Sequence, residues 1–352
     1  MQYARLGDTG LVVSRLAFGS MTFGSVTQGP FTSVYKVDQA GANELVARAI
    51  DAGINYFNSA DVYAGGDSER MLGRALGSRR KEVVIATKVG NRMGPGLIES
   101  GLSRRHIFAA ADASLARLGT DYIDVYLVHK VDPFTPIEET LEALEDLVRQ
   151  GKVRYIGFSN WPAWMAAKAV GLQRARGWSQ FRAAEMYYSL VGRDLEHEVV
   201  PFVADAGIGV MVWSPLAGGF LSGKYTRANP KGDSGARLAG LDFLPYDRDR
   251  GYALVDLLTT VGGKHRATPA QVALAWLLTR PQVATLLVGA SSVKQLDENL
   301  GATAVTLDKD DLQQLDEATR PTVMYPNWFT DRVGDSRVFQ ALGVAQTTPS
   351  VR

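Results

Sequence analysis

Apolar positions along the chain follow two spacings that alternate from one segment to the next. Short runs rich in β-branched residues are separated by longer stretches in which apolar residues recur every three or four positions, as in Ile137, Leu141, Leu144 and Val148. The first spacing predicts strands and the second predicts amphipathic helices. The predicted strands are residues 14–19, 55–58, 83–87, 124–128, 153–157, 182–186, 209–213 and 285–288, and among the predicted helices are residues 104–118, 136–150, 162–175 and 268–279.

Eight strands with helices between them favour an α/β fold of the (β/α)₈ TIM-barrel class. The alternative is a doubly wound sheet, which usually carries a Gly-x-Gly-x-x-Gly turn after its first strand, and this chain has no such turn. We therefore expect one barrel domain over residues 1–352. The expected additions are a hairpin at residues 1–14, long loops at residues 22–36 and 216–249 after the first and seventh strands, and a tail at residues 321–352.

Composition excludes several classes of function. The 352 residues include no cysteine, which rules out disulfides, thiolate metal sites and cysteine nucleophiles. A formal net charge of +1 gives no electrostatic support for binding nucleic acid or an anionic membrane. The four histidines are scattered, so we predict no metal site. The first residues lack the apolar run of a signal peptide and no apolar run is long enough to span a bilayer, so we expect a cytoplasmic protein. Oligomeric state has no signature in the sequence.

Polar residues stand at the ends of three successive predicted strands. Asn58 ends the second strand with Tyr63 just beyond it, Lys88 follows the third, and His129 follows the fourth. In a barrel these strand ends lie on one rim. A tyrosine beside a cation can protonate a carbonyl oxygen that accepts hydride, and a histidine can orient that oxygen. Each residue alone is more often structural, but the three together indicate carbonyl chemistry.

These residues belong to motifs that recur in a known family. The chain resembles the aldo-keto reductases in order over residues 5–305, and its cofactor segments resemble the branch that includes the potassium-channel β-subunits. The matching motifs are Asn58-Ser59-Ala60-Asp61-Val62-Tyr63, Ala86-Thr87-Lys88, His129 with Asp132, Gly151-Lys152-Val153-Arg154-Tyr155-Ile156-Gly157, Trp213-Ser214-Pro215-Leu216, Ser222-Gly223-Lys224-Tyr225 and Gly289-Ala290-Ser291. The resemblance implies a barrel that holds a nicotinamide dinucleotide without a Rossmann motif.

Carried over residue by residue, the resemblance assigns roles. Tyr63 would be the general acid, Lys88 its pKa modulator and His129 the carbonyl orienter, with Asn58 at the same catalytic centre. The residues expected to bind the cofactor are Gly19, Met21, Ser159, Asn160, Glu185, Trp213, Ser214, Pro215, Leu216, Gly218, Lys224, Gly289, Ser291, Gln295, Glu298 and Asn299. Within this set Trp213 would stack on the nicotinamide ring. Phe23, Trp161 and Trp328 are expected to line the substrate pocket together with Met21.

Three positions depart from the family pattern. Asn58 replaces the usual aspartate, so it cannot neutralise Lys88. Asp61 could swing in as a substitute, but capping a turn is its more ordinary role and the one we expect. Glu185 stands where the family commonly has glutamine. Ser291 stands where many members carry a cation for the 2′-phosphate of NADP, but nearby donors, Lys294 among them, keep NADPH the expected cofactor, with NADH as the alternative.

Two functions fit these residues. The first is an NADPH-dependent oxidoreductase that transfers hydride to an aldehyde, ketone or sugar-like carbonyl, with Tyr63 as the proton donor. The second is a nicotinamide-binding regulatory or partner-binding subunit with vestigial reductase activity, which Asn58 favours. The intact Tyr63, Lys88 and His129 favour the first.

Overall fold

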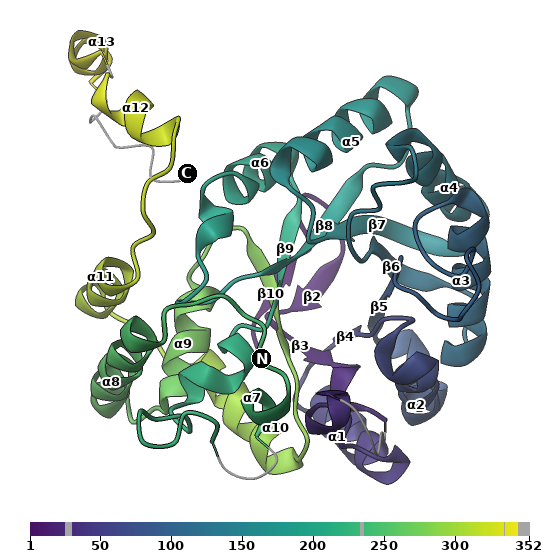
Figure 1. Ribbon diagram of the computed structural model, residues 1–352, viewed down its shortest axis with the longest axis horizontal. Coiled ribbons are helices and arrows are strands. Elements are labelled where there is room, and N and C mark those ends of the chain that lie inside the picture. The colour runs from purple at the N-terminus through teal and green to yellow at the C-terminus, as the bar shows by residue number, and fades with distance from the viewer. Residues whose placement is uncertain (25–29, 233–235, 334, 344–352) are drawn as a thin grey trace.

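Eight parallel strands form a closed barrel, as the sequence predicts (Figure 1). The computed structural model describes residues 1–24, 30–232, 236–333 and 335–343, so parts of the predicted loops and tail (25–29, 233–235, 334 and 344–352) lie outside the described residues. The barrel strands are β3 (Leu16–Gly19), β4 (Tyr56–Asn58), β5 (Val84–Val89), β6 (Ile123–Val128), β7 (Val153–Ser159), β8 (Phe181–Tyr187), β9 (Gly209–Trp213) and β10 (Val283–Val288). β10 pairs with β3 and closes the barrel.

Helices surround the barrel and cover its outer face (Figure 1). The α-helices are α1 (Gln39–Asp51), α2 (Asp67–Leu76), α3 (Arg104–Leu118), α4 (Ile137–Arg149), α5 (Ala163–Arg176), α6 (Val199–Ala206), α7 (Arg237–Gly240), α8 (Arg248–His265), α9 (Pro269–Leu278), α10 (Val293–Leu300), α11 (Lys309–Ala318), α12 (Asn327–Arg332) and α13 (Ser336–Ala341). Short 3₁₀ turns complete the described elements, among them η2 (Pro30–Ser33), η3 (Tyr63–Gly66) and η6 (Ala217–Ser222). None of the described helices combines the length and the apolar character that crossing a membrane requires.

The predicted hairpin covers the end of the barrel at which the strands begin. β1 (Tyr3–Arg5) pairs antiparallel with β2 (Val12–Ser14). Its turn contacts the start of β9, where the Asp8 amide donates to the Gly207 carbonyl over 2.9 Å. Gly7 has φ +59, and a Cβ there would lie 2.4 Å from the Gly207 oxygen, so the turn requires glycine. The opposite end of the barrel stays open for the site.

The alternation of side chains along each strand decides which residues enter the barrel. Small and apolar side chains such as Ala86, Leu127 and Ala183 fill its interior and form one buried cluster. Two residues further along their strands, the same alternation places Lys88 and Glu185 on the inner face. Polar groups thus sit on top of an apolar floor, at the ends of the strands where barrel active sites lie.

The C-terminal tail lies away from this site. α12 and α13 follow α11 and extend outward from the barrel (Figure 1). The loop after β9 takes the opposite course, because its helix α7 packs against η2 of the loop after β3. Segments of the two long loops therefore meet over the open end of the barrel.

Candidate active site

Tyr63, Lys88 and Asn58 meet at one rim of the barrel, as the sequence predicts. Lys88 is fully buried, and its Nζ donates to Asn58 Oδ1 over 2.7 Å, to the Ser59 carbonyl over 2.8 Å and to Tyr63 Oη over 3.3 Å. Tyr63 reaches this point because the chain turns into η3 directly after β4. The lysine therefore connects the tyrosine hydroxyl to the residue that replaces the family's aspartate.

The negative charge next to Lys88 comes from Glu185. Glu185 Oε1 lies 3.1 Å from Lys88 Nζ, and Glu185 Oε2 accepts from Asn58 Nδ2 over 2.7 Å. Burial lowers the pKa of Lys88, but Glu185 and Tyr63 outweigh it, so the pKa lies above its usual value. Lys88 is therefore protonated at neutral pH.

The pKa of Tyr63 is shaped by the same charges. Burial raises it, the Lys88 charge lowers it and the Glu185 charge raises it, so that it ends above its usual value. Tyr63 consequently keeps its proton at neutral pH and can donate it to an oxygen that becomes negative.

His129 lies beside Tyr63 and is neutral. The two rings meet edge to face, with centroids 6.0 Å apart. Burial, together with Lys88 and Lys130, lowers the pKa of His129 well below its usual value. The Asn91 amide nitrogen lies 2.8 Å from His129 Nδ1, and because an amide nitrogen only donates, Nδ1 accepts and the proton resides on Nε2. His129 can thus donate a hydrogen bond into the cavity.

Asn160 links the end of β7 to the end of β9. Its Oδ1 accepts from the Trp213 indole over 3.0 Å, and its Nδ2 donates to Ser159 Oγ over 2.8 Å and to the His129 carbonyl over 3.2 Å. Its φ of 57° is a left-handed conformation that asparagine tolerates better than most residues. These bonds fix the edge of the Trp213 ring, which borders the cavity.

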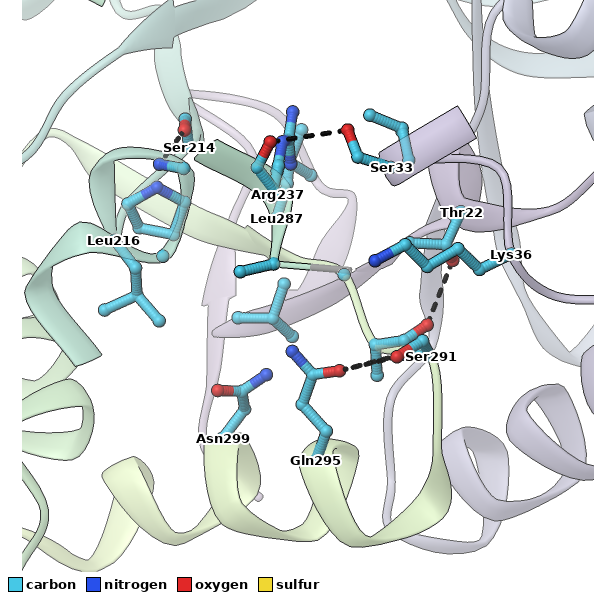
Figure 2. A pocket seen from close by; sticks show the side chains of 18 of the residues that line it. Thr22, Ser33, Lys36, Ser214, Leu216, Arg237, Leu287, Ser291, Gln295 and Asn299 are labelled. Carbon is cyan, nitrogen blue, oxygen red and sulfur yellow. Dashed lines mark hydrogen bonds between the residues drawn. The ribbon is translucent and has the colours of Figure 1, made fainter. Parts of the chain in front are cut away.

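The cavity continues into a second one and forms a cleft. The part beside Tyr63 and His129 has a volume of about 430 Å³, and the adjoining part has a volume of about 350 Å³. Both include Thr22, Ser214, Arg237 and Gly289. Figure 2 shows the second part, with residues from the ends of several strands directed into it. An elongated cleft of this kind suits a dinucleotide.

Three cations gather in the second part of the cleft. Lys36, Lys224 and Arg237 line it. Burial lowers the pKa of Lys36, with Arg237 as the second cause; burial also lowers the pKa of Lys224, followed by Lys36 and Arg237. Burial lowers the pKa of Arg237. A cleft lined by three cations, two of which have a pKa lowered by a neighbouring cation, fits a polyphosphate ligand.

The far end of the cleft is polar and uncharged. The Ser291 amide and hydroxyl both donate to Gln295 Oε1, over 2.9 and 3.2 Å, which leaves the Gln295 amide nitrogen directed at the cavity (Figure 2). Asn299 lies beside it, whereas Glu298 and Lys294 are exposed and do not line the cleft. The predicted cofactor-binding residues that do line it are Gly19, Met21, Ser159, Asn160, Glu185, Trp213, Ser214, Pro215, Leu216, Gly218, Lys224, Gly289, Ser291, Gln295 and Asn299.

The aromatic residues expected at the substrate pocket lie elsewhere. Phe23 has no exposed surface and packs on Phe18, and Trp161 is 2% exposed and packs on Phe158. Their prediction as pocket residues is wrong because both side chains complete the layer between strands and helices. Trp328 lies on α12 and borders neither part of the cleft, so its prediction is also wrong.

Asp61 neither caps a turn nor pairs with Lys88. It is fully buried, and neither carboxylate oxygen has a hydrogen-bond partner among the described residues. Burial raises its pKa to about 7, with Glu69 as the second cause. The expected capping role is wrong, and the carboxylate is instead buried where Arg117 and Lys88 act on it through space.

Several residues of the cleft escaped prediction from sequence. Lys36 and Phe243 line the cleft from loops, Arg237 lines it from the start of the short helix α7, and Asn91 contacts His129 from the loop after β5. Phe243 stacks on Trp213 with ring centroids 6.3 Å apart and an interplanar angle of 15°. Loop length indicated that residues 22–36 and 216–249 belong to the site, but it did not indicate the loop of Asn91, and no spacing distinguishes the particular residues.

Comparison with known proteins gives one family. A sequence model of the Aldo/keto reductase family matches residues 15–320. Versiconal hemiacetal acetate reductase of Aspergillus parasiticus is 34% identical over 93% of this chain and 99% of its own length. The uncharacterized oxidoreductase YrpG of Bacillus subtilis is 37% identical over 90% of this chain and 95% of its own. A probable voltage-gated potassium channel subunit beta of Arabidopsis thaliana is 36% identical over 88% of this chain and 95% of its own.

Proposed function

Because this chain belongs to the aldo/keto reductase family and is therefore a nicotinamide-dependent oxidoreductase, we propose that it uses NADPH to reduce an aldehyde, ketone or sugar-like carbonyl, with Tyr63 as the proton donor. The observation that carries the proposal is the contact of Lys88 Nζ with Tyr63 Oη, 3.3 Å apart, at the floor of the cleft. The relatives named as reductases support the reaction class.

The residues present fit a nicotinamide dinucleotide. Lys224, Lys36 and Arg237 would hold the phosphates, and Ser291, Gln295 and Asn299 the adenosine end. Asn160 and Ser159 present polar groups beside Trp213, where the nicotinamide carboxamide and ring would bind. When bound, the cofactor supplies the hydride.

The side chains of this protein manage the proton and the carbonyl. His129 Nε2–H donates to the carbonyl oxygen and directs it toward Tyr63. As negative charge develops on that oxygen, Tyr63 Oη transfers its proton and becomes a phenolate. Lys88, protonated and 3.3 Å away, stabilises this phenolate. Solvent then returns a proton to Tyr63.

The direct test is NADPH oxidation with a panel of aldehydes, ketones and keto-sugars, for the wild type and Tyr63→Phe. We expect turnover of at least one class, and a loss in Tyr63→Phe of about 10²–10⁴-fold, the usual contribution of a positioned acid. The dissociation constant for NADPH, measured by calorimetry, should stay within about twofold. Unchanged turnover in Tyr63→Phe would refute the proton-donor role.

The alternative function is a nicotinamide-binding regulatory subunit. Identity of 36% to the Arabidopsis channel subunit favours it. The lack of a charge at Asn58 is weaker support for this alternative than the sequence suggests, because Glu185 supplies a carboxylate to Lys88. A protein that binds NADPH tightly and turns over no member of the panel would support this alternative.

A further inference from the structure

Lys88 requires a counterion that residue 58 does not provide. Its side chain has no exposed surface, and an unpaired ammonium in such a place is strongly destabilising. Asn58 and the Ser59 carbonyl supply dipoles only. Glu185, with a side chain 3% exposed, is the carboxylate in contact, 3.1 Å from Nζ.

Asn58 is matched to this arrangement by its two unlike ends. Its carbonyl oxygen accepts from Lys88, and its amide nitrogen donates to Glu185, each over 2.7 Å. An aspartate at position 58 would instead set a second anion against the Glu185 carboxylate. Asparagine at 58 and glutamate at 185 therefore form a complementary pair, and Lys88 closes a ring of three side chains from β4, β5 and β8.

Other titratable groups around Lys88 do not replace Glu185. Tyr63 from η3 and His129 at the end of β6 are neutral at pH 7. Asp61 acts on Lys88 through space only, and its own pKa of about 7 leaves it partly protonated. The charge of Glu185, in contrast, raises the pKa of both Lys88 and Tyr63.

We propose that Glu185 is the counterion of the active-site lysine, and that together with Asn58 it positions Lys88 in its protonated form against Tyr63. The carboxylate that pairs with the lysine is thus on β8, across the barrel interior, and not on β4, where the family's usual aspartate would stand. This role rests on the proposed function of Tyr63 as the proton donor. It makes Glu185 a positioning residue, in addition to its place in the wall of the cleft.

The test moves the charge between the two positions. Glu185→Gln removes the anion, Asn58→Asp adds a second one, and the double variant Asn58→Asp/Glu185→Gln returns a single anion to position 58. The measurements are the pH profile of kcat/KM for NADPH-dependent reduction and the thermal midpoint at several pH values. Asp124→Asn is the control, because it removes another ion pair that is largely shielded from solvent, the 2.7 Å contact with Arg80, at the start of β6.

We expect each single variant to lose about 10–100-fold in kcat/KM and to melt at lower temperature than the wild type. In Glu185→Gln the basic limb of the profile should move to lower pH, because both Lys88 and Tyr63 lose a charge that raises their pKa. In the double variant kcat/KM should return to within about fivefold of the wild-type value, and the basic limb of the pH profile and the thermal midpoint should be restored. Such a recovery would show that positions 58 and 185 are strongly coupled. Asp124→Asn should have a lower thermal midpoint than the wild type, with the basic limb of its pH profile unchanged.

The proposal is overturned if Glu185→Gln keeps the wild-type profile and thermal midpoint, or if the double variant loses as much as the two singles together. It is also overturned if Glu185→Gln fails to fold and the double variant fails as well, since moving the charge back then rescues nothing. The melting data need no turnover. Coupled thermal midpoints in a protein that reduces no carbonyl would therefore support the counterion while refuting the proposed reaction.

Discussion

Asn91 sets the tautomer of His129. Its amide nitrogen donates to Nδ1 over 2.8 Å, which places the imidazole proton on Nε2, the atom left to face a substrate carbonyl. The histidine is kept neutral by burial and by the charge of Lys88, so its catalytic use is hydrogen bonding. A loop residue outside every strand therefore determines what a strand-end histidine can donate.

This arrangement predicts an order of activity at position 91. Asn91→Ala frees both tautomers, and kcat/KM at pH 7 should fall about tenfold, as losses of a partner that orients histidine often do. The kcat/KM of Asn91→Asp should be lower still, because a carboxylate attracts the imidazole proton to Nδ1 and leaves Nε2 as an acceptor that faces the substrate carbonyl. Its activity should recover toward low pH, where the imidazolium carries both protons.

Steady-state assays from pH 5 to 9 check this order, with NADPH affinity as the control that should not change. Equal activities of Asn91→Ala and Asn91→Asp across that range would show that the tautomer of His129 is unimportant.

Trp213 offers a second prediction, on cofactor binding. Its indole N–H donates to Asn160 and its ring borders the cleft beside Phe243. Trp213→Ala should raise the dissociation constant for NADPH about tenfold, the effect of losing an aromatic contact of about 1–1.5 kcal/mol. Trp213→Phe keeps an aromatic ring but loses the indole N–H that donates to Asn160. It therefore separates the effect of stacking on NADPH affinity from the effect of the hydrogen bond that orients Asn160.

Calorimetric titration with NADPH distinguishes the two contributions. An affinity unchanged in Trp213→Ala would contradict the stacking role, and a Trp213→Phe variant as weak as Trp213→Ala would assign the effect to the hydrogen bond.

Strand alternation explains why so much of the fold could be predicted. Runs such as residues 125–128 are apolar on both faces because one face meets the barrel interior and the other meets helices. β6 begins within one residue of the predicted start at residue 124. The same alternation, continued past the last apolar residue, placed Lys88 and His129 at the rim. Those parts of the site depend only on local spacing.

Contacts across the barrel could not be predicted in this way. Asn58 and Glu185 lie 127 positions apart, and their 2.7 Å contact depends on how eight strands close rather than on either local sequence. The family resemblance assigned Glu185 to the cofactor and left Lys88 without an anion. The predictions for Phe23 and Trp161 were wrong for a related reason. That a residue comes soon after a strand end does not reveal whether its aromatic ring turns outward to the helix layer.

Lys36 gives a third prediction, on cofactor preference. It lines the cleft with Lys224 and Arg237, and we expect it to contribute to phosphate binding. Lys36→Gln should weaken NADPH about fivefold to tenfold and make its binding less dependent on salt. Lys294→Gln is the matched control, since Lys294 is exposed outside the cleft.

Parallel titrations with NADPH and NADH identify the phosphate concerned. A loss confined to NADPH assigns Lys36 to the 2′-phosphate, and equal losses assign it to the pyrophosphate. No change for either cofactor would contradict a phosphate role.

Asp61 leads to a prediction on stability. Burial raises its pKa to about 7 in the folded protein, from the usual 3.8 of an unfolded chain. Between these two values the folded state holds a proton that the unfolded state has released, so stability must fall as the pH rises from about 4 to about 7 and then level off. The raised carboxyl pKa destabilises the protein above neutral pH, where the folded state must ionise a carboxylate that has no hydrogen-bond partner among the described residues.

Asp61→Asn should remove this slope. At pH 8 the variant should be more stable than the wild type, by about 4 kcal/mol if the whole difference in pKa is recovered, and the advantage should vanish toward pH 4. Urea unfolding at half-unit steps of pH measures the difference, with Asp121→Asn, an exposed aspartate, as the control. Stability curves that run parallel for Asp61→Asn and the wild type would mean that Asp61 titrates normally. A steeper fall in the variant would mean that the ionised carboxylate stabilises the fold through Lys88 and Arg117, the two cations that act on it.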